Sequence, residues 1–183
     1  TMQKPGSLGA TLVPVSDWKQ WTCTATATID VGGNVGDTAV PMARSVGAQG
    51  VVIALELVTA FHINLVAQAT INRPLRILPF NLGAAGQECA KKASCGLRHT
   101  GSLRRLVHLP TWLGGAPLSQ VLPHLSFVKI DVDGLSPTIL ATLSQMPARG
   151  AARSDPRYRP VIKVEWFQGH RQEGCDGAAS RRV

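Results

Sequence analysis

Short runs of apolar residues alternate along this chain with longer stretches in which apolar residues recur every three or four positions. The short runs are rich in Val, Ile and Leu and predict buried β-strands at 26–31, 51–56, 75–80, 125–131 and 160–166. The longer stretches predict helices with one apolar face at 37–46, at 59–72 and from 136 onward. Because strands and helices alternate, the pattern predicts an α/β fold with an open, mostly parallel sheet and helices on both of its faces.

Single residues predict where these helices begin and end. Pro41 predicts a late start or a loosened first turn for the first helix, since a proline in a helix interior costs about 3 kcal/mol. Gly47 and Asn72 are expected to end the first and second helices. Thr59 and Ser136 are expected to cap the helices that follow them. The second helix is expected to bury a stripe made of Phe61, Leu65 and Ala69.

Two stretches between the strands lack a clear period. Residues 82–101 are rich in Gly, Ala and Ser and predict an irregular surface insertion. Residues 103–109 predict a strand or one arm of a hairpin.

The length of 183 residues fits one domain, which we place at 26–168. Residues 1–25 are expected to be a lead-in segment whose Trp18 and Trp21 cover one edge of the sheet. Residues 169–183 are expected to be a polar, disordered tail.

The composition is that of a globular protein, with 44% hydrophobic residues and a formal net charge of +8. Residues 147–159 form a basic linker, and their arginines fit either a grip on phosphate or a solvated loop; the Arg/Ala-rich composition favours the loop. No apolar run approaches the roughly 20 residues that a membrane helix needs. No secretory signal is recognisable, so the cytoplasm is the default expectation, although the chain opens with Thr1 and a fragment is an open alternative.

The four cysteines are Cys23, Cys89, Cys95 and Cys175, and none of them forms the C-x-x-C pair of a zinc site. Cys89 and Cys95 are close enough in sequence to close a small loop, but reduced thiols are the default expectation. We expect no metal site.

The richest motif is the stretch from Thr28 to Gly36, where the run Thr-Ile-Asp-Val breaks into Gly32, Gly33, Asn34 and Gly36. A strand, a glycine-rich turn and a helix form a nucleotide site at the carboxyl ends of the strands of an open α/β sheet. The motif is neither a phosphate-binding P-loop, because no Lys-Ser/Thr follows, nor a complete G-x-G-x-x-G.

This stretch, Ile29-Asp-Val-Gly-Gly-Asn-Val-Gly36, resembles the first motif of class I S-adenosylmethionine-dependent methyltransferases, and more narrowly that of the FkbM-type family. The resemblance covers roughly residues 26–168 and implies a Rossmann-like fold. Such a sheet has two further strands after the fifth, and the residues after 168 are too few and too polar to form them, so we expect a truncated or minimal domain.

The resemblance implies S-adenosylmethionine as the cofactor. Its methionine end would need backbone donors and close approach from Gly32, Asn34 and Gly36, and Asp30 would accept from its amino group. Glu56 ends the second strand about 20 residues after the glycine loop, where a carboxylate accepts from the two ribose hydroxyls; the alternative is a surface glutamate. The family pattern also matches Phe61, Leu65 and Asn72, but has proline where this chain has Leu57.

Asn81 follows the third strand and is expected either to approach the adenine edge of the cofactor or to cap the turn. An amide suits the adenine edge because that edge needs both hydrogen-bond donors and acceptors.

A second motif, Lys129-Ile-Asp-Val-Asp-Gly134, looks like the family's Lys-Ile-Asp-Val-Glu-Gly. Strand alternation places Lys129, Asp131 and Asp133 on one side of the strand. Asp131 is the candidate catalytic residue that orients or deprotonates an acceptor hydroxyl, and Lys129 and Asp133 are candidate substrate-binding residues. The alternatives are a structural ion pair and, on weaker evidence, a Mg²⁺ site.

We therefore expect a methyltransferase that acts on a hydroxyl of a small molecule or a sugar. A nucleic-acid substrate is not expected, because an Asn/Asp-Pro-Pro-aromatic motif is missing after the fourth strand. Two departures from the family pattern affect the acceptor site: Leu135-Ser136-Pro137 replaces an expected acidic residue, and Gly114 follows Leu113 where the family has Asp. They motivate the alternative of a degenerate cofactor-binding or interaction domain without activity; a nicotinamide-dependent dehydrogenase is a third hypothesis.

Overall fold

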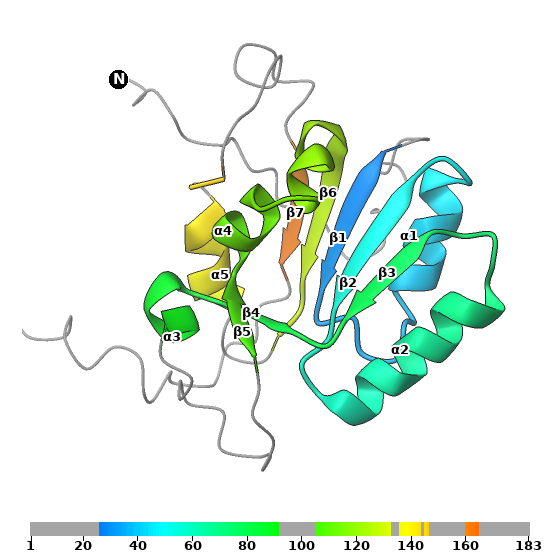
Figure 1. Ribbon diagram of the computed structural model, residues 1–183, viewed down its shortest axis with the longest axis horizontal. Helices are drawn as coiled ribbons and strands as arrows, with labels where there is room; N and C mark the ends of the chain where they lie inside the picture. Colours follow the sequence, from blue (N-terminus) through cyan, green and yellow to red (C-terminus); the bar gives the residue numbers. More distant parts are fainter. Residues whose placement is uncertain (1–25, 92–104, 133–135, 144, 147–159, 165–183) are drawn as a thin grey trace, which may run out of the picture.

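A parallel sheet of five strands forms the centre of the computed structural model, which describes residues 26–91, 105–132, 136–143, 145–146 and 160–164 (Figure 1). The strands in spatial order are β3 (Ile77–Phe80), β2 (Val51–Leu55), β1 (Ala27–Val31), β6 (Leu125–Ile130) and β7 (Val161–Val164). All four neighbouring pairs are parallel. The chain runs outward from β1 to β3 and then crosses to the other side of β1, which is the strand order of a Rossmann-like fold. The predicted fold class and all five predicted sheet strands are confirmed.

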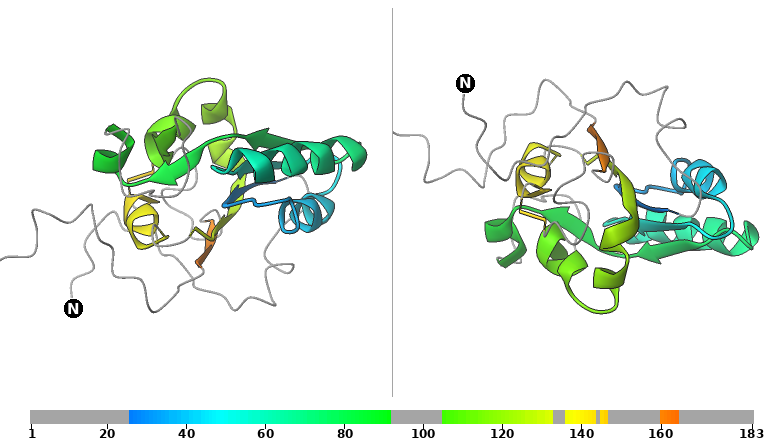
Figure 2. Two further views of the ribbon diagram at one scale, coloured as in Figure 1. Left: turned by 90° about the horizontal axis from the view of Figure 1, so that it is seen from below. Right: turned by 90° about the horizontal axis from the view of Figure 1, so that it is seen from above.

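Helices cover both faces of this sheet. Helices α1 (Ala39–Val46) and α2 (Thr59–Ile71) pack on one face, in an apolar cluster that includes Met42, Leu65 and Phe127. Helices α4 (Leu109–Gly114) and α5 (Ser136–Leu143) pack on the other face, around Ile29 and Ile130. Both views in Figure 2 show β6 and β7 between α1 and α5.

A second, smaller sheet lies beside the main one, and the sequence did not predict it. Strand β4 (Gly83–Ala85) pairs in parallel with β5 (Leu106–His108), and helix α3 (Gln87–Lys91) follows β4. The irregular insertion predicted for 82–101 is therefore wrong over 83–91, and the strand predicted within 103–109 is confirmed, but in parallel pairing rather than as a hairpin arm. Short 3₁₀ turns at Leu118–Gln120 and Leu122–His124 lead into β6.

Packing leaves little room for a side chain at Gly83, the first residue of β4. A Cβ added to Gly83 would lie 2.8 Å from Leu106 Cδ2 and 3.1 Å from Leu57 Cδ1. The position therefore accepts no side chain without movement of its neighbours.

The predicted helix ends are partly confirmed. Helix α1 begins at Ala39, so that Pro41 falls in its first turn, and Gly47 ends it with a φ of 74°. Asn72 follows the last residue of α2 as expected. The capping role predicted for Thr59 is wrong, because α2 begins at this residue and its hydroxyl donates to Asn81 Oδ1.

Two further predictions about helices need correction. The capping role predicted for Ser136 is wrong, because α5 begins at this residue; its hydroxyl donates to the carbonyl of Val132 at 2.9 Å and so links α5 to the chain that leaves β6. In α2 only Leu65 is buried, Ala69 is half-buried, and Phe61 is 44% exposed because it faces the cavity described below.

Cys89 of α3 is buried and disulfide-bonded, so the expected reduced thiol is wrong at this position. Its partner lies outside the described residues, as do the other cysteines, the lead-in segment, the basic linker and the tail. Among the helices that the structure describes, none has the length and apolar character needed to cross a membrane.

Candidate functional site

A cavity of about 370 Å³ opens at the carboxyl ends of β1, β2 and β6, next to the point where the strand order reverses. Its lining consists of Val31, Gly32, Asn34, Leu55, Glu56, Leu57, Val58, Phe61, Leu82, Gly83, Ala84, Asp131 and Val132. Small-molecule sites typically enclose about 300–1,000 Å³ and hold a few polar groups on an apolar wall. The cavity has both properties and lies where open α/β sheets bind ligands.

The glycine loop after β1 is fixed to the end of β2. The amides of Gly32 and Gly33 both donate to the carbonyl of Leu55, each at 2.9 Å, and the amide of Gly36 donates to the carbonyl of Gly33 at 2.8 Å. Gly32 and Gly36 have φ values of 81° and 94°, in the left-handed region that favours glycine. Asn34, with a φ of 46°, is the non-glycine residue with positive φ among those described.

Gly32 also allows the close approach of another strand. A Cβ at this position would lie 1.9 Å from the backbone oxygen of Asp131, which follows β6. The loop thus packs directly against the end of β6, and glycine is required for both its conformation and its contact.

The carboxylate of Glu56 joins the glycine loop to the start of α2. Its Oε2 accepts from the amide of Asn34 at 2.8 Å, and its Oε1 accepts from the amide of Val58 at 2.6 Å. The residue is 6% exposed and lines the cavity. Each carboxylate oxygen has further acceptor capacity, so the group can also receive hydrogen bonds from two hydroxyls of a ligand.

These bonds change what the loop can offer to a ligand. The amides of Gly32, Asn34 and Gly36, predicted as donors to a cofactor, are all engaged within the protein. Gly32 and Asn34 line the cavity, whereas Gly36 does not and packs against Gln68. In this structure the loop lets a ligand come close to its backbone. Its amides would have to leave their present acceptors before they could donate to that ligand.

A network of ion pairs between Lys129, Asp30 and Asp131 adjoins the glycine loop. Lys129 Nζ lies 3.1 Å from Asp30 Oδ1 and 3.3 Å from Asp131 Oδ2, and it donates to the carbonyl of Gly32 at 3.2 Å. The ammonium group has three donors, and these three acceptors match them. Lys129 therefore connects the ends of β1 and β6 to the glycine loop.

The network shifts the pKa values of two of its members. Complete burial raises the pKa of Asp30 to about 6, although the charge of Lys129 and its hydrogen bond oppose the shift. Burial alone would lower the pKa of Lys129, but the charges of Asp30 and Asp131 outweigh it and hold that pKa above its usual value. The second oxygen of Asp30, Oδ2, is buried without a hydrogen-bond partner, which is consistent with an acid that is costly to ionise.

The sequence-predicted site residues therefore fall into three groups. Gly32, Asn34, Glu56 and Asp131 meet at the cavity. Asp30, Lys129, Gly36 and Asn81 lie outside its lining, and the side chain of Asn81 donates to the carbonyls of Glu56 and Leu57 at 2.9 and 3.2 Å. Asp133 lies outside the described residues.

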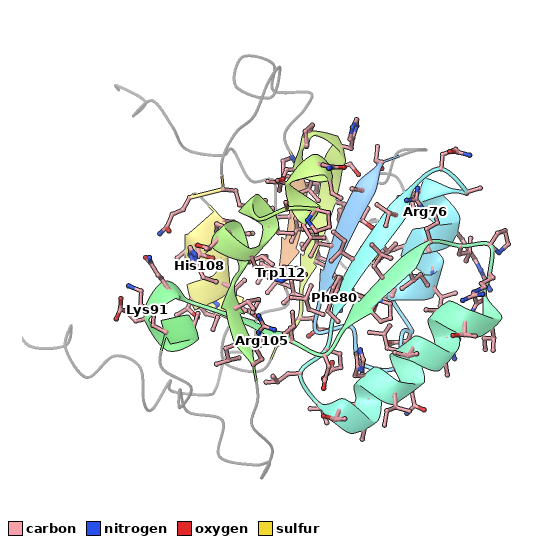
Figure 3. All side chains as sticks on the ribbon, viewed as in Figure 1. Arg76, Phe80, Lys91, Arg105, His108 and Trp112 are labelled. Atoms are coloured by element: carbon pink, nitrogen blue, oxygen red, sulfur yellow. The ribbon has the colours of Figure 1, made fainter. Side chains whose placement is uncertain are left out.

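Sequence reasoning missed most of the apolar wall of the cavity. Val58 directly precedes α2, Leu82 directly precedes β4, and Ala84 lies in β4. The available signal for β4 was the run Leu82-Gly-Ala-Ala85 shortly after the third strand. The rings of Phe80 and Trp112, which do not line the cavity, meet edge to face with centroids 5.0 Å apart (Figure 3). The pair packs against the apolar cluster on this face of the sheet.

Comparisons with known proteins add little to this geometry. No protein-family model and no curated protein matches the chain. A solved structure from Clostridium thermocellum, named "putative rRNA-methylase", is 16% identical, with 70% of this chain and 75% of that chain covered and a TM-score of 0.37. A likeness at this level carries no argument about activity, and the fold assignment rests on the strand order described above.

Proposed function

We propose that this chain is an S-adenosylmethionine-dependent methyltransferase of the FkbM type that methylates a hydroxyl group of a small molecule or a sugar. The observation that carries the proposal is Glu56. Glu56 directly follows β2, and its carboxylate accepts from the amide of Asn34 in the glycine loop and lines the cavity.

The residues of the cavity fit this cofactor. Glu56 would accept from the two ribose hydroxyls, and the apolar side chains of Leu57, Val58 and Leu82 would contact the adenine. Glu56 and Asp131 are acidic, and the lining contains no Lys, Arg or His among the described residues. Two carboxylates in a lining without a cationic side chain favour a cationic ligand, and the cofactor carries a sulfonium charge.

When bound, the cofactor supplies a methyl group on sulfur that an acceptor oxygen takes by in-line displacement. The chain's own task is alignment of the acceptor and exclusion of water. Asp131 lines the cavity, is 33% exposed, and is positioned by the ammonium of Lys129 at 3.3 Å. It would accept the hydrogen bond of the acceptor hydroxyl and orient its oxygen, and receive the proton as the oxygen–carbon bond forms.

The roles of Asp30 and Lys129 are structural in this proposal. Both side chains are buried below the loop, and neither lines the cavity. They would position Asp131 and the carbonyl of Gly32 rather than touch the acceptor. Asp133 is retained as a candidate acceptor-binding residue on the sequence pattern alone.

Calorimetry with S-adenosylmethionine tests the role of Glu56. Glu56→Ala should weaken binding by roughly 1–3 kcal/mol, because the loop amides and the ribose hydroxyls lose their acceptor. Glu88→Ala is the matched control, since this glutamate lies on the surface of α3, where it pairs with Lys91 and is remote from the cavity lining. An unchanged affinity in Glu56→Ala would remove Glu56 from the site.

Transfer is tested with labelled cofactor and a cell extract that contains acceptor molecules. The wild-type chain should label a hydroxyl compound, and Asp131→Asn should bind the cofactor but label little. Binding of the cofactor without any transfer by the wild-type chain would favour the alternative, a cofactor-binding domain without activity. Binding of NADH instead would favour a dehydrogenase.

A further inference from the structure

Helix α2 exposes an apolar surface that carries no charge. The thirteen residues from Thr59 to Ile71 include no Asp, Glu, Lys or Arg, and only Leu65 is buried. Such a helix is unusual at the surface of a chain with a net charge of +8, because exposed helix faces are normally charged.

Six of the exposed residues of α2 lie on one continuous face, with the exposed polar residues Thr59 and Asn64 beside them. At 100° per residue, Ala60, Ile63, Val66, Ala67, Thr70 and Ile71 lie on the side of the helix opposite Leu65, and we call them the α2 outer face. All six are exposed, with Ile63 at 62%, Val66 at 39% and Ile71 at 73%. Figure 1 shows α2 at the rim of the molecule, beside the strand β3.

The other exposed large apolar side chains in the described part of the chain lie elsewhere. Phe61 lines the cavity. Leu78 alternates with Ile77, which packs in the cluster beneath α1 and α2, so Leu78 points to the opposite face of the sheet. The α2 outer face is therefore a separate surface, distinct from the candidate cofactor site.

We infer that the α2 outer face is a self-association surface that packs against the same face of a second copy of this chain. A face without charge gives no electrostatic complement to a charged partner, and it adds no repulsion of its own to that between two chains of net charge +8. The α2 outer face of a second copy is an uncharged surface of the same kind. The inference is independent of the proposed methyl transfer.

The spacing of the face is self-complementary. Ile63 and Ile71 lie four residues before and after Ala67, so an antiparallel pair of α2 helices with its two-fold axis at Ala67 brings Ile63 against Ile71 of the partner subunit, twice. The small side chain of Ala67 at the crossing point allows the helices the usual 8–10 Å separation. Antiparallel packing also sets opposite ends of the two helix dipoles side by side.

Two other occupants fit less well. A strand from another chain could instead pair with the outer edge of β3, but Pro79 opposes this. The carbonyls of Arg76 and Phe80 accept from the amides of Val52 and Glu56, so even-numbered residues of β3 face β2 and odd-numbered residues face outward. Pro79 therefore faces outward, and it has no N–H to donate to an added strand. A helix that lies on a bilayer usually carries Lys and Arg on its polar side, and α2 carries none.

The expected association is weak. A helix of this length is about 20 Å long, and one helix face buries less than the roughly 800 Å² per partner of a standard interface. Dimers should therefore appear only as the protein concentration rises.

Sedimentation velocity across the micromolar to submillimolar range tests the inference on the full chain. The wild-type chain should shift from monomer to dimer, and Ile63→Glu should raise the dissociation constant at least about tenfold, because it buries an unpaired charge twice per dimer. Leu78→Glu is the matched control: it places the same charge on an apolar residue that is 41% exposed, but on the other face of the sheet. It should leave the dissociation constant unchanged. Circular dichroism confirms that each variant is folded.

A charge-swap variant tests the antiparallel register. The double variant Ile63→Glu/Ile71→Lys should dimerise more tightly than either single variant, because the two-fold arrangement brings unlike charges together in both contacts. A parallel arrangement would bring like charges together and abolish this rescue. A wild-type chain that stays monomeric throughout the range, or an association that Ile63→Glu does not weaken, would overturn the inference; binding of the monomer to neutral lipid vesicles would instead assign the face to a membrane surface.

Discussion

At the scale of single residues, Lys129 is the link between the sheet and the glycine loop. Its ammonium compensates two carboxylates and one carbonyl in a place where its own side chain is 4% exposed. Removal of one partner from a buried pair leaves the other charge unpaired, which costs more than the pair contributes. The stability of the fold and the shape of the site therefore depend on the same side chain.

We predict that Lys129→Met lowers the free energy of unfolding by about 3–5 kcal/mol at pH 7, as measured by urea denaturation. Lys91→Met is the control, because Lys91 pairs with Glu88 at the surface of α3, with both side chains largely exposed, and should cost less than about 1 kcal/mol. Equal effects of the two substitutions would show that the buried network contributes no more than a surface pair.

Asp30 predicts a pH dependence with a definite sign. Its pKa is raised by burial from 3.8 to about 6 in the folded chain, so between these pH values the folded chain holds a proton that the unfolded chain has lost. The contribution of Asp30 to stability is therefore present below about pH 4 and is lost as the pH rises through about 6. The charges that face it are those of Lys129, Asp131 and Asp37.

The comparison of wild type with Asp30→Asn isolates this effect, because the other titrating groups are common to both chains. Relative to the variant, the wild-type chain should lose on the order of 1–3 kcal/mol of unfolding free energy between pH 4 and pH 7. A gain over the same range would mean that Lys129 outweighs burial and lowers the pKa of Asp30. A carboxyl NMR titration of Asp30 reads the same pKa directly.

At the scale of elements, the helices and strands that depend on local sequence pattern can be predicted, whereas those that depend on contacts between distant residues cannot. The five main strands are predictable because burial on both faces makes them nearly continuous apolar runs. Strand β4 is not, since Gly-Ala-Ala has little strand propensity and its pairing with β5 spans 23 residues in register. The position of Glu56 follows from its place at the end of a strand, whereas the partnership of Lys129 with Asp30, 99 residues earlier, needs the folded sheet.

The turn from β1 to α1 gives a prediction at this scale. Gly32→Ala should destabilise the chain by more than about 2 kcal/mol, because alanine is strained at a φ of 81° and its Cβ would collide with the backbone oxygen of Asp131. Gly114→Ala is the matched control, since a Cβ there meets nothing within 4 Å, and it should be neutral or stabilising by up to about 1 kcal/mol. Thermal unfolding of the two variants makes the comparison, and a Gly32→Ala chain as stable as wild type would show that the loop moves away from β6 at little cost.

At the scale of the whole molecule, the strand order separates the two surfaces that we assign. The cavity lies at the carboxyl ends of β1, β2 and β6, where the chain reverses direction across the sheet, and the α2 outer face points away from the sheet. Helix α2 nevertheless supports both, because its buried residue Leu65 packs against Gly33 and Gly36 of the loop. Ligand binding should therefore stabilise the whole fold while leaving association largely unaffected.

The stabilisation of the fold by bound ligand can be measured as a change in the free energy of unfolding. S-adenosylmethionine at 100 times its dissociation constant should raise the free energy of unfolding by about 2.7 kcal/mol, because it binds the folded chain alone. For a chain of this size that corresponds to a rise of roughly 5–10 °C in the unfolding temperature. Ile63→Glu should keep the full rise, since its side chain lies outside the cavity. Glu56→Ala should lose roughly 1–2.4 kcal/mol of the stabilisation at the same ligand concentration, which follows from a binding free energy weaker by roughly 1–3 kcal/mol. A rise that Glu56→Ala retains in full would place the cofactor somewhere other than this cavity, even if binding itself were demonstrated.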